Sequence, residues 1–289
     1  ARAIARPRGG RRVSPRPERA GRGRASCAVG PRAAMQEGAY DFVLMGPTGF
    51  IGAAILQHLE GAGYRTLATR IRLQDRSGLE KLLDEARPKI GLICAAGERG
   101  RPNISWCDSH PVETLDANVT CQLAVAAACK ARGLHCVLVG TGVVYSADPA
   151  LPGYRFKEDD PPNVKDPGVY VALRIQQEEL LKYFDNVLTL RVLYPVSSDL
   201  DPRGLIGKLA RFQRVDRVQT SVTIFDSLCP LIPELCKRGV TGVLNFANGG
   251  TVSYADIIEE LARRAPQGWQ PPPLAEGAAR AAAELDVAR

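Results

Sequence analysis

Short hydrophobic runs alternate with longer mixed stretches along residues 40–195. Such runs are typical of strands that are buried on both faces of a sheet. The predicted strands are Phe42–Met45, Arg65–Thr69, Ile90–Cys94, His135–Val139 and Val187–Val192. The predicted helices run from the first strand to Leu59 and over Gly78–Ala86, Val112–Arg132 and Val169–Tyr183. Strands that alternate with helices predict an α/β fold with a doubly wound parallel sheet.

The pattern loosens after Pro195. Ser253 precedes the predicted helix Tyr254–Arg263, which has Asp256 in its first turn, so Ser253 is the expected N-cap. We therefore expect a main domain over residues 35–195 and a smaller lobe over residues 196–289. The lobe should cover the carboxyl edge of the sheet and can return strands or helices to it.

Composition and charge are those of an ordinary globular protein with one unusual segment. The chain has 289 residues, of which 45% are hydrophobic and 24% charged. Its net charge of +7 comes from residues 1–34, where ten arginines and one acid, Glu18, give +9. The rest of the chain therefore carries −2, and no nucleic-acid-binding face is expected on it.

Residues 1–34 are rich in arginine, glycine, proline and alanine and have no hydrophobic period, which predicts a disordered tail. Four interpretations stay open: a transit peptide, a linker from a longer protein, translated sequence upstream of a start at Met35, or an RNA-binding arm. The scarcity of serine argues against the first, and the absence of interleaved aromatic residues argues against the last. We expect a cytoplasmic protein, or an organellar one if the tail is a transit peptide.

Neither a membrane span nor a metal site is expected. The most apolar stretch, Cys121–Val139, is interrupted by Lys130 and Arg132. The eight cysteines form no CxxC pair and mostly lie in apolar runs, so we interpret them as buried free thiols in a reducing compartment.

Three glycines stand where the first strand meets the first helix, in the sequence GPTGFIG. Gly46 permits a tight turn, Gly49 lets the backbone approach a pyrophosphate, and Gly52 permits close packing of helix on strand. The N-terminus of the helix offers free N–H groups and a positive dipole to phosphates. The motif predicts a dinucleotide cofactor in a Rossmann domain. Its expected contacts are Gly46, Thr48, Gly49, Phe50, Ile51 and Gly52.

The residues after the second strand favour NADPH, with NADH as the alternative. An acid at this position would bind the 2′-hydroxyl of NAD, but Thr69 is followed by Arg70 and Arg72. Arginines suit the 2′-phosphate of NADPH through charge-assisted contacts, unless they only face solvent. We expect Asp75, a few residues later, to meet the adenine amino group.

Thr141, Tyr170 and Arg174 form a candidate catalytic group. Thr141 ends the fourth strand, Tyr170 begins the next helix, and Arg174 follows one turn later on the same face. A Ser or Thr with a Tyr-x-x-x-Lys pair is the catalytic group of short-chain dehydrogenases, where the tyrosine donates a proton to a carbonyl as hydride arrives. In this chain the cation is an arginine.

The chain resembles the bifunctional nucleotide-rhamnose synthases of plants and algae, which are extended short-chain dehydrogenases. The resemblance is most specific in GRPNISWCDSH at residues 100–110, and it includes NVLTLRV at 186–192, PVSSD at 195–199 and ELD at 284–286. Members of this family are 3,5-epimerases and 4-reductases of UDP- or dTDP-4-keto-6-deoxy-glucose. The resemblance implies an oxidoreductase of rhamnose biosynthesis with a nucleotide-sugar substrate and no nucleic-acid or membrane partner. It leaves a homodimer open.

The resemblance also implies roles for single residues. Thr141 and Tyr170 match the pair that polarises the carbonyl, and Lys208 matches a lysine assigned to epimerisation. The residues expected near the substrate are Arg101, Asn103, Asn118, Val143, Ser197 and Ser198. Those expected to complete the cofactor site are Ala95, Ala96, Gly97, Tyr170, Arg174 and Pro195.

Three positions depart from the family pattern. The catalytic lysine is Arg174, the epimerase cysteine is Val143, and the asparagine before Ala-Ala-Gly is Cys94. Two functions are therefore expected as alternatives. One is an NADPH-dependent 4-reductase, with or without residual 3,5-epimerase activity. The other is a non-catalytic NADP-binding subunit, as in the regulatory beta subunit of methionine adenosyltransferase, which has the same reductase fold.

Overall fold

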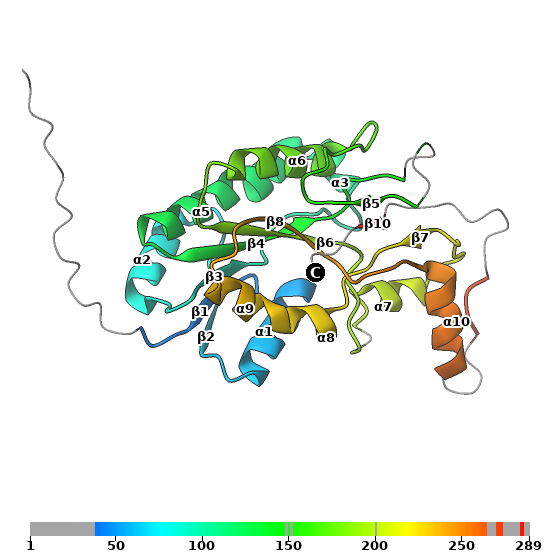
Figure 1. Cartoon of the computed structure of the whole chain (residues 1–289), viewed down its shortest axis with the longest axis horizontal. Coiled ribbons are helices and arrows are strands. Elements are labelled where there is room, and N and C mark those ends of the chain that lie inside the picture. Colours follow the sequence, from blue (N-terminus) through cyan, green and yellow to red (C-terminus); the bar gives the residue numbers. More distant parts are fainter. Residues whose placement is uncertain are drawn as a thin grey trace, which may run out of the picture. The chain divides into compact units, whose positions relative to one another are not determined.

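The computed structural model describes residues 38–147, 150, 153–199, 201–264, 270–273 and 284–285. The expectations for the arginine-rich tail and for Met35 lie outside these residues. Six parallel strands form the main sheet in the order β2-β1-β3-β4-β6-β8 (Figure 1). They are β1 (Phe42–Met45), β2 (Thr66–Thr69), β3 (Gly91–Cys94), β4 (His135–Thr141), β6 (Val187–Val192) and β8 (Gly242–Phe246).

Helices cover both faces of this sheet (Figure 1). They are α1 (Phe50–Gly61), α2 (Arg76–Ala86), α3 (Trp106–Ser109), α4 (Pro111–Leu115), α5 (Cys121–Ala131), α6 (Val169–Leu181), α7 (Leu205–Leu209), α8 (Phe225–Leu228), α9 (Ile232–Lys237) and α10 (Tyr254–Arg264). A π-helical segment, η1 (Asp116–Thr120), separates α4 from α5, and a 3₁₀ turn, η2 (Cys229–Leu231), precedes α9. The short strands are β5 (Arg155–Phe156), β7 (Gln219–Thr220), β9 (Val252–Ser253) and β10 (Glu284–Leu285).

The buried residues of β1 alternate between two hydrophobic cores. Phe42 and Leu44 pack with α1, α8 and α9 on one face, whereas Val43 and Met45 pack with α2 and α5 on the other. This alternation follows from the period of two in a strand and explains why the whole run is hydrophobic. The doubly wound α/β fold predicted from the sequence is confirmed.

The parallel strands place their carboxyl ends at one edge, where Met45 is paired with Cys94, and Thr141 with Val192. From β1 the chain first moves outward to β2 and then crosses back to β3. The crevice between the ends of β1 and β3 is therefore the switch point at which sheets of this class bind ligands.

The part after Pro195 contributes both to the main sheet, through β8, and to a separate small core. In that core Leu209 of α7 and Ile258 of α10 pack together. Ser253 is the predicted N-cap of α10: its hydroxyl accepts from the Asp256 N–H at 3.0 Å, and its own N–H donates to the Asp256 carboxylate at 2.9 Å. No helix in the described ranges is long and apolar enough to cross a membrane.

Candidate active site

The glycine turn after β1 is shaped as the sequence predicts. Gly46 has φ of +76°, and a Cβ there would lie 2.8 Å from the Ala96 nitrogen. A Cβ at Gly52 would lie 2.1 Å from the Gly46 oxygen, whereas one at Gly49 would meet only that oxygen, at 3.5 Å. A side chain therefore has no room at Gly46 or Gly52, whereas the space beside Gly49 is unobstructed. No side chain caps α1 at Gly49, which leaves the helix N-terminus to an anion such as a pyrophosphate.

Arg70 and Arg72 follow β2 and are both exposed. Neither side chain forms a hydrogen bond or ion pair with the residues that the structure describes, so both guanidinium groups can meet a phosphate. Asp75, by contrast, is the N-cap of α2 and accepts from the Gly78 N–H at 2.9 Å. Any contact of Asp75 with an adenine amino group has to share a carboxylate that already caps a helix.

Two buried amides hold the loop after β3, which contains Ala95, Ala96 and Gly97. Asn118 in η1 accepts from the Glu98 N–H at 3.0 Å and donates to the Glu98 carbonyl at 2.5 Å. Gln122 in α5 donates to the Ala96 carbonyl at 2.9 Å. Asn118 is only 1% exposed and supports this loop through both bonds, while its expected place near the substrate stays a prediction.

The predicted catalytic residues lie where α6 meets the end of β4. Thr141 is the last residue of β4, and Tyr170, the second residue of α6, is half-buried. Arg174 is 3% exposed and donates from Nη2 to the Val139 carbonyl, two residues before Thr141. Its Nε is buried without a partner among the described residues. The Arg174 contact thus fixes α6 beside the carboxyl end of β4.

The segment GRPNISWCDSH follows the β3 loop in the chain and is hydrogen-bonded to the start of α6. Asp108 accepts from the Val169 N–H at 2.8 Å and so caps α6 directly before Tyr170. Asn103 accepts from the Ser105 N–H at 3.0 Å, within its own turn, while Arg101 is exposed. Arg101 is therefore available to contact a ligand. The side-chain oxygen of Asn103, by contrast, already accepts a hydrogen bond within the turn.

On the C-terminal side of the site, Lys208 in α7 is half-buried. Burial, and secondarily the nearby Arg99 cation, lower the pKa of Lys208 below its usual value of 10.5. Ser198 donates to Asp226 at 3.1 Å and Ser197 bonds to Asp199, so both hydroxyls are held by carboxylates. Pro195 accepts from the Leu205 N–H at 3.4 Å and links the end of β6 to α7.

No thiol in the described part of the chain replaces the one missing at Val143. Val143 is half-buried against a small cluster that includes Tyr145 and Leu193. All seven described cysteines are buried. Burial raises the pKa of Cys94, the thiol at the end of β3, to about 12, so it is inert as an acid or base near neutral pH.

Several residues of the site were not predicted from the sequence. Asp108 and Gln122 act on backbone groups far away in the chain, and no spacing pattern reveals such contacts. Arg191 did carry a signal, because a charged residue inside the apolar run Val187–Val192 requires a buried partner. That partner, Glu178, lies one turn after Arg174 in α6.

Residues 42–198 match the family model of the NAD dependent epimerase/dehydratase family, which covers more than half of the chain. The chain belongs to this family. Among its relatives, the bifunctional dTDP-4-dehydrorhamnose 3,5-epimerase/dTDP-4-dehydrorhamnose reductase of Arabidopsis thaliana is 40% identical over 224 residues, 76% of this chain and 74% of that protein. A trifunctional UDP-glucose 4,6-dehydratase/3,5-epimerase/reductase of the same plant is 38% identical over 78% of this chain, which spans 34% of that protein.

Solved structures of this epimerase/dehydratase fold agree with the sheet and its helices. The L780 UDP-rhamnose synthase from Acanthamoeba polyphaga mimivirus has a TM-score of 0.73 at 24% identity and covers 80% of this chain and 83% of that one. The dTDP-4-dehydrorhamnose reductase of Bacillus anthracis, solved in complex with NADP, has a TM-score of 0.70 at 15% identity over 87% and 90% of the chains.

Proposed function

We propose that this protein is an NADPH-dependent reductase of a UDP- or dTDP-linked 4-keto-6-deoxy sugar, with 3,5-epimerisation weakened or lost. The observation that carries the proposal is the contact of Arg174 with Val139, which brings the start of α6, with Tyr170, to the end of β4, with Thr141. The glycine turn opens on the same edge of the sheet. The relatives at 38–40% identity act on such sugars.

The residues divide the chemistry as follows. Tyr170 donates a proton to the oxygen at C4 of the sugar, and the Thr141 hydroxyl stabilises the charge on that oxygen. When bound, NADPH supplies a hydride to the carbonyl carbon. Arg70 and Arg72 hold its 2′-phosphate, and the N-terminus of α1 holds its pyrophosphate.

Epimerisation needs more than reduction does. The C4 ketone acidifies the C3 and C5 protons, so a base can remove one, but inversion also needs an acid on the opposite face of the carbon. Lys208 is a suitable base because its pKa is lowered. Val143 has no proton to give, and an apolar side chain does not order a water in its place.

The test is to mix the purified protein with NADPH and UDP-4-keto-6-deoxy-glucose and to follow the absorbance of NADPH. We expect oxidation by the wild type, and a rate lower by about 10²–10⁴-fold for Tyr170→Phe, which lacks only the proton donor. Tight NADPH binding without oxidation would instead establish the second function, a non-catalytic NADP-binding subunit. The identity of the cation is what favours that alternative: the Arg174 guanidinium that stands in place of the family lysine is bound to a backbone carbonyl, although the same contact positions α6.

We also propose that the protein acts in the cytoplasm. A separate proposal concerns its assembly: the protein forms a homodimer through α4 and α6. These two helices contact one another and expose large apolar side chains: Val112 is 72% and Tyr183, just past α6, is 88% exposed. Large apolar side chains that are this exposed can be buried by association with a second copy. Light scattering should give the mass of a dimer for the wild type and of a monomer for Val112→Lys with Tyr183→Lys.

A further inference from the structure

A buried ion pair joins β6 to α6 beneath the candidate active site. The Nη2 atom of Arg191 lies 2.7 Å from Oε2 of Glu178, and Nε lies 3.2 Å from Oε1. Their side chains are only 4% and 6% exposed. A buried ion pair contributes little net stability compared with apolar residues of similar volume, so its presence is better explained by the geometry it imposes.

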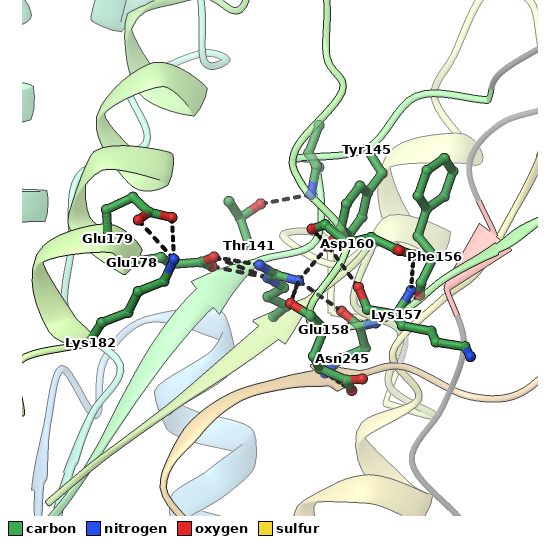
Figure 2. A network of polar contacts seen from close by, with 12 residues as sticks. Thr141, Tyr145, Phe156, Lys157, Glu158, Asp160, Glu178, Glu179, Lys182 and Asn245 are labelled. Atoms are coloured by element: carbon green, nitrogen blue, oxygen red, sulfur yellow. Dashed lines mark hydrogen bonds and ion pairs between the residues drawn. The ribbon is translucent and has the colours of Figure 1, made fainter. Parts of the chain in front are cut away.

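The same guanidinium group holds the loop that follows β4. Nη1 of Arg191 donates to the hydroxyl of Tyr145 at 2.8 Å. This hydroxyl lies 2.8 Å from the Lys157 carbonyl and 2.9 Å from the Asp160 carbonyl. Figure 2 shows Tyr145 at the centre of these contacts, with Thr141 close to the start of its loop. Tyr145 is 5% exposed, and its hydroxyl is thus part of the scaffold.

A second set of bonds fastens the far end of this loop to β8. The Glu158 carboxylate accepts from the Asn245 N–H at 2.8 Å, and the Asn245 amide donates to the Phe156 carbonyl at 3.0 Å. Tyr145 also stacks on Phe156, with ring centroids 4.6 Å apart (Figure 2). The loop is therefore bound to β6 near its start and to β8 near its end.

The position of Glu178 in α6 gives this network its functional meaning. Tyr170, Arg174 and Glu178 are spaced four residues apart and so lie along one face of the helix. A bond that fixes Glu178 therefore fixes the rotation of α6 about its axis, and with it the direction of Tyr170. The bond to Tyr145 fixes the loop that begins just after Thr141.

We propose that Arg191 is a positioning residue that aligns Tyr170 on α6 and Thr141 on β4 toward one substrate carbonyl. This inference rests on the proposed reductase function. It predicts that the network controls turnover, while the cofactor site at β1, β2 and α1 does not depend on it.

The test uses the full chain and a double variant, Arg191→Met with Glu178→Leu, which removes both charges and leaves neither unpaired. Tyr145→Phe is the second variant, because it keeps the ion pair and the ring stack and loses only the hydroxyl. The control is Glu179→Gln with Lys182→Gln, which removes an exposed ion pair at the C-terminal end of the same helix. For each protein we would measure kcat, KM, the NADPH Kd, the melting temperature and hydrogen exchange of residues 142–147 and 153–163.

We expect both test variants to lose roughly 10²-fold in kcat, as displaced catalytic groups typically do, with KM and NADPH Kd within twofold of wild type. The loop amides should exchange faster, and the control should match wild type. The inference is overturned if kcat and loop exchange are unchanged, or if NADPH affinity and melting temperature fall together with kcat. An inactive wild type would instead refute the proposed function, and loop exchange alone would then decide whether the network holds the loop.

Discussion

At the scale of single residues, we expect position 174 to set how well the proposed site reduces a ketone. The Arg174 guanidinium donates to the Val139 carbonyl, and its Nε is buried without a partner among the described residues. An ammonium group is compact, whereas a guanidinium is planar and forked, so the two cannot occupy the same place beside Tyr170.

We therefore predict that Arg174→Lys raises kcat for reduction, by part of the roughly 10²–10⁴-fold that acid assistance provides. Arg174→Met, which has similar length and no charge, should lower it. Steady-state kinetics with NADPH in excess measures both. An unchanged or lower rate for Arg174→Lys would mean that the site has adapted to arginine.

Because burial lowers the pKa of Lys208 below its usual value, the site gives a pH prediction. Burial and the Arg99 cation both favour the neutral amine, so deuterium exchange at C3 or C5 of the sugar should rise with pH around a midpoint below 10.5. Arg99→Ala removes one cause, which raises the pKa, lowers the neutral fraction at a given pH and moves the midpoint upward. Arg99→Lys keeps the charge and should keep the profile. A midpoint that stays in place for Arg99→Ala would exclude this role of Arg99.

We expect Arg70 and Arg72 to set the cofactor preference. We predict tighter binding of NADPH than of NADH, by about 1–3 kcal/mol for each good phosphate contact. The double variant Arg70→Ser with Arg72→Ser should lose this preference and keep its affinity for NADH. Fluorescence titration of both cofactors measures it, and equal affinities in the wild type would contradict the assignment.

At the scale of elements, the sequence predicts the regular parts and misses what depends on distant partners. The run Phe42–Met45 is hydrophobic throughout because both of its faces are buried, so its pattern alone predicts β1. The predicted helix Val112–Arg132 is interrupted by η1. The sequence did not predict this interruption, because hydrophobic periodicity over such a length tolerates one wider turn. That turn carries Asn118, whose role in holding the β3 loop could not be predicted from spacing.

The cap on α6 leads to a prediction at the same scale. Asp108→Ala removes the acceptor at the Val169 N–H, which should cost about 0.5–2 kcal/mol of stability and lower kcat, because Tyr170 is the next residue. Asp108→Asn keeps an acceptor and should retain most activity. Ser253→Ala, which removes the cap of α10, is the control: it should lose similar stability without losing kcat. Equal kcat losses in Asp108→Ala and Ser253→Ala would contradict a specific role for Asp108.

At the scale of the whole molecule, the site is assembled from segments that the chain brings together only by folding. The glycine turn, the end of β4 and α6 all precede Pro195 in the chain, whereas Lys208 lies in α7, after it. Arg203, just before α7, donates to the Thr48 carbonyl at 2.8 Å and so ties the two regions together. The glycine motif and the Tyr170–Arg174 spacing can be recognised in the sequence because each lies within one local segment. Contacts between distant segments, such as that of Arg203 with Thr48, cannot.

The central claim is that this site reduces a 4-keto sugar nucleotide without efficiently inverting C3 and C5. The most direct measurement is an NMR analysis of the product made from UDP-4-keto-6-deoxy-glucose and NADPH in deuterated water. We predict NADPH oxidation and a reduced sugar whose C3 and C5 keep their configuration, with Val143→Cys increasing the deuterium at these carbons. UDP-rhamnose as the main product of the wild type, with deuterium at both carbons, would contradict the account, as would a substrate left unreduced.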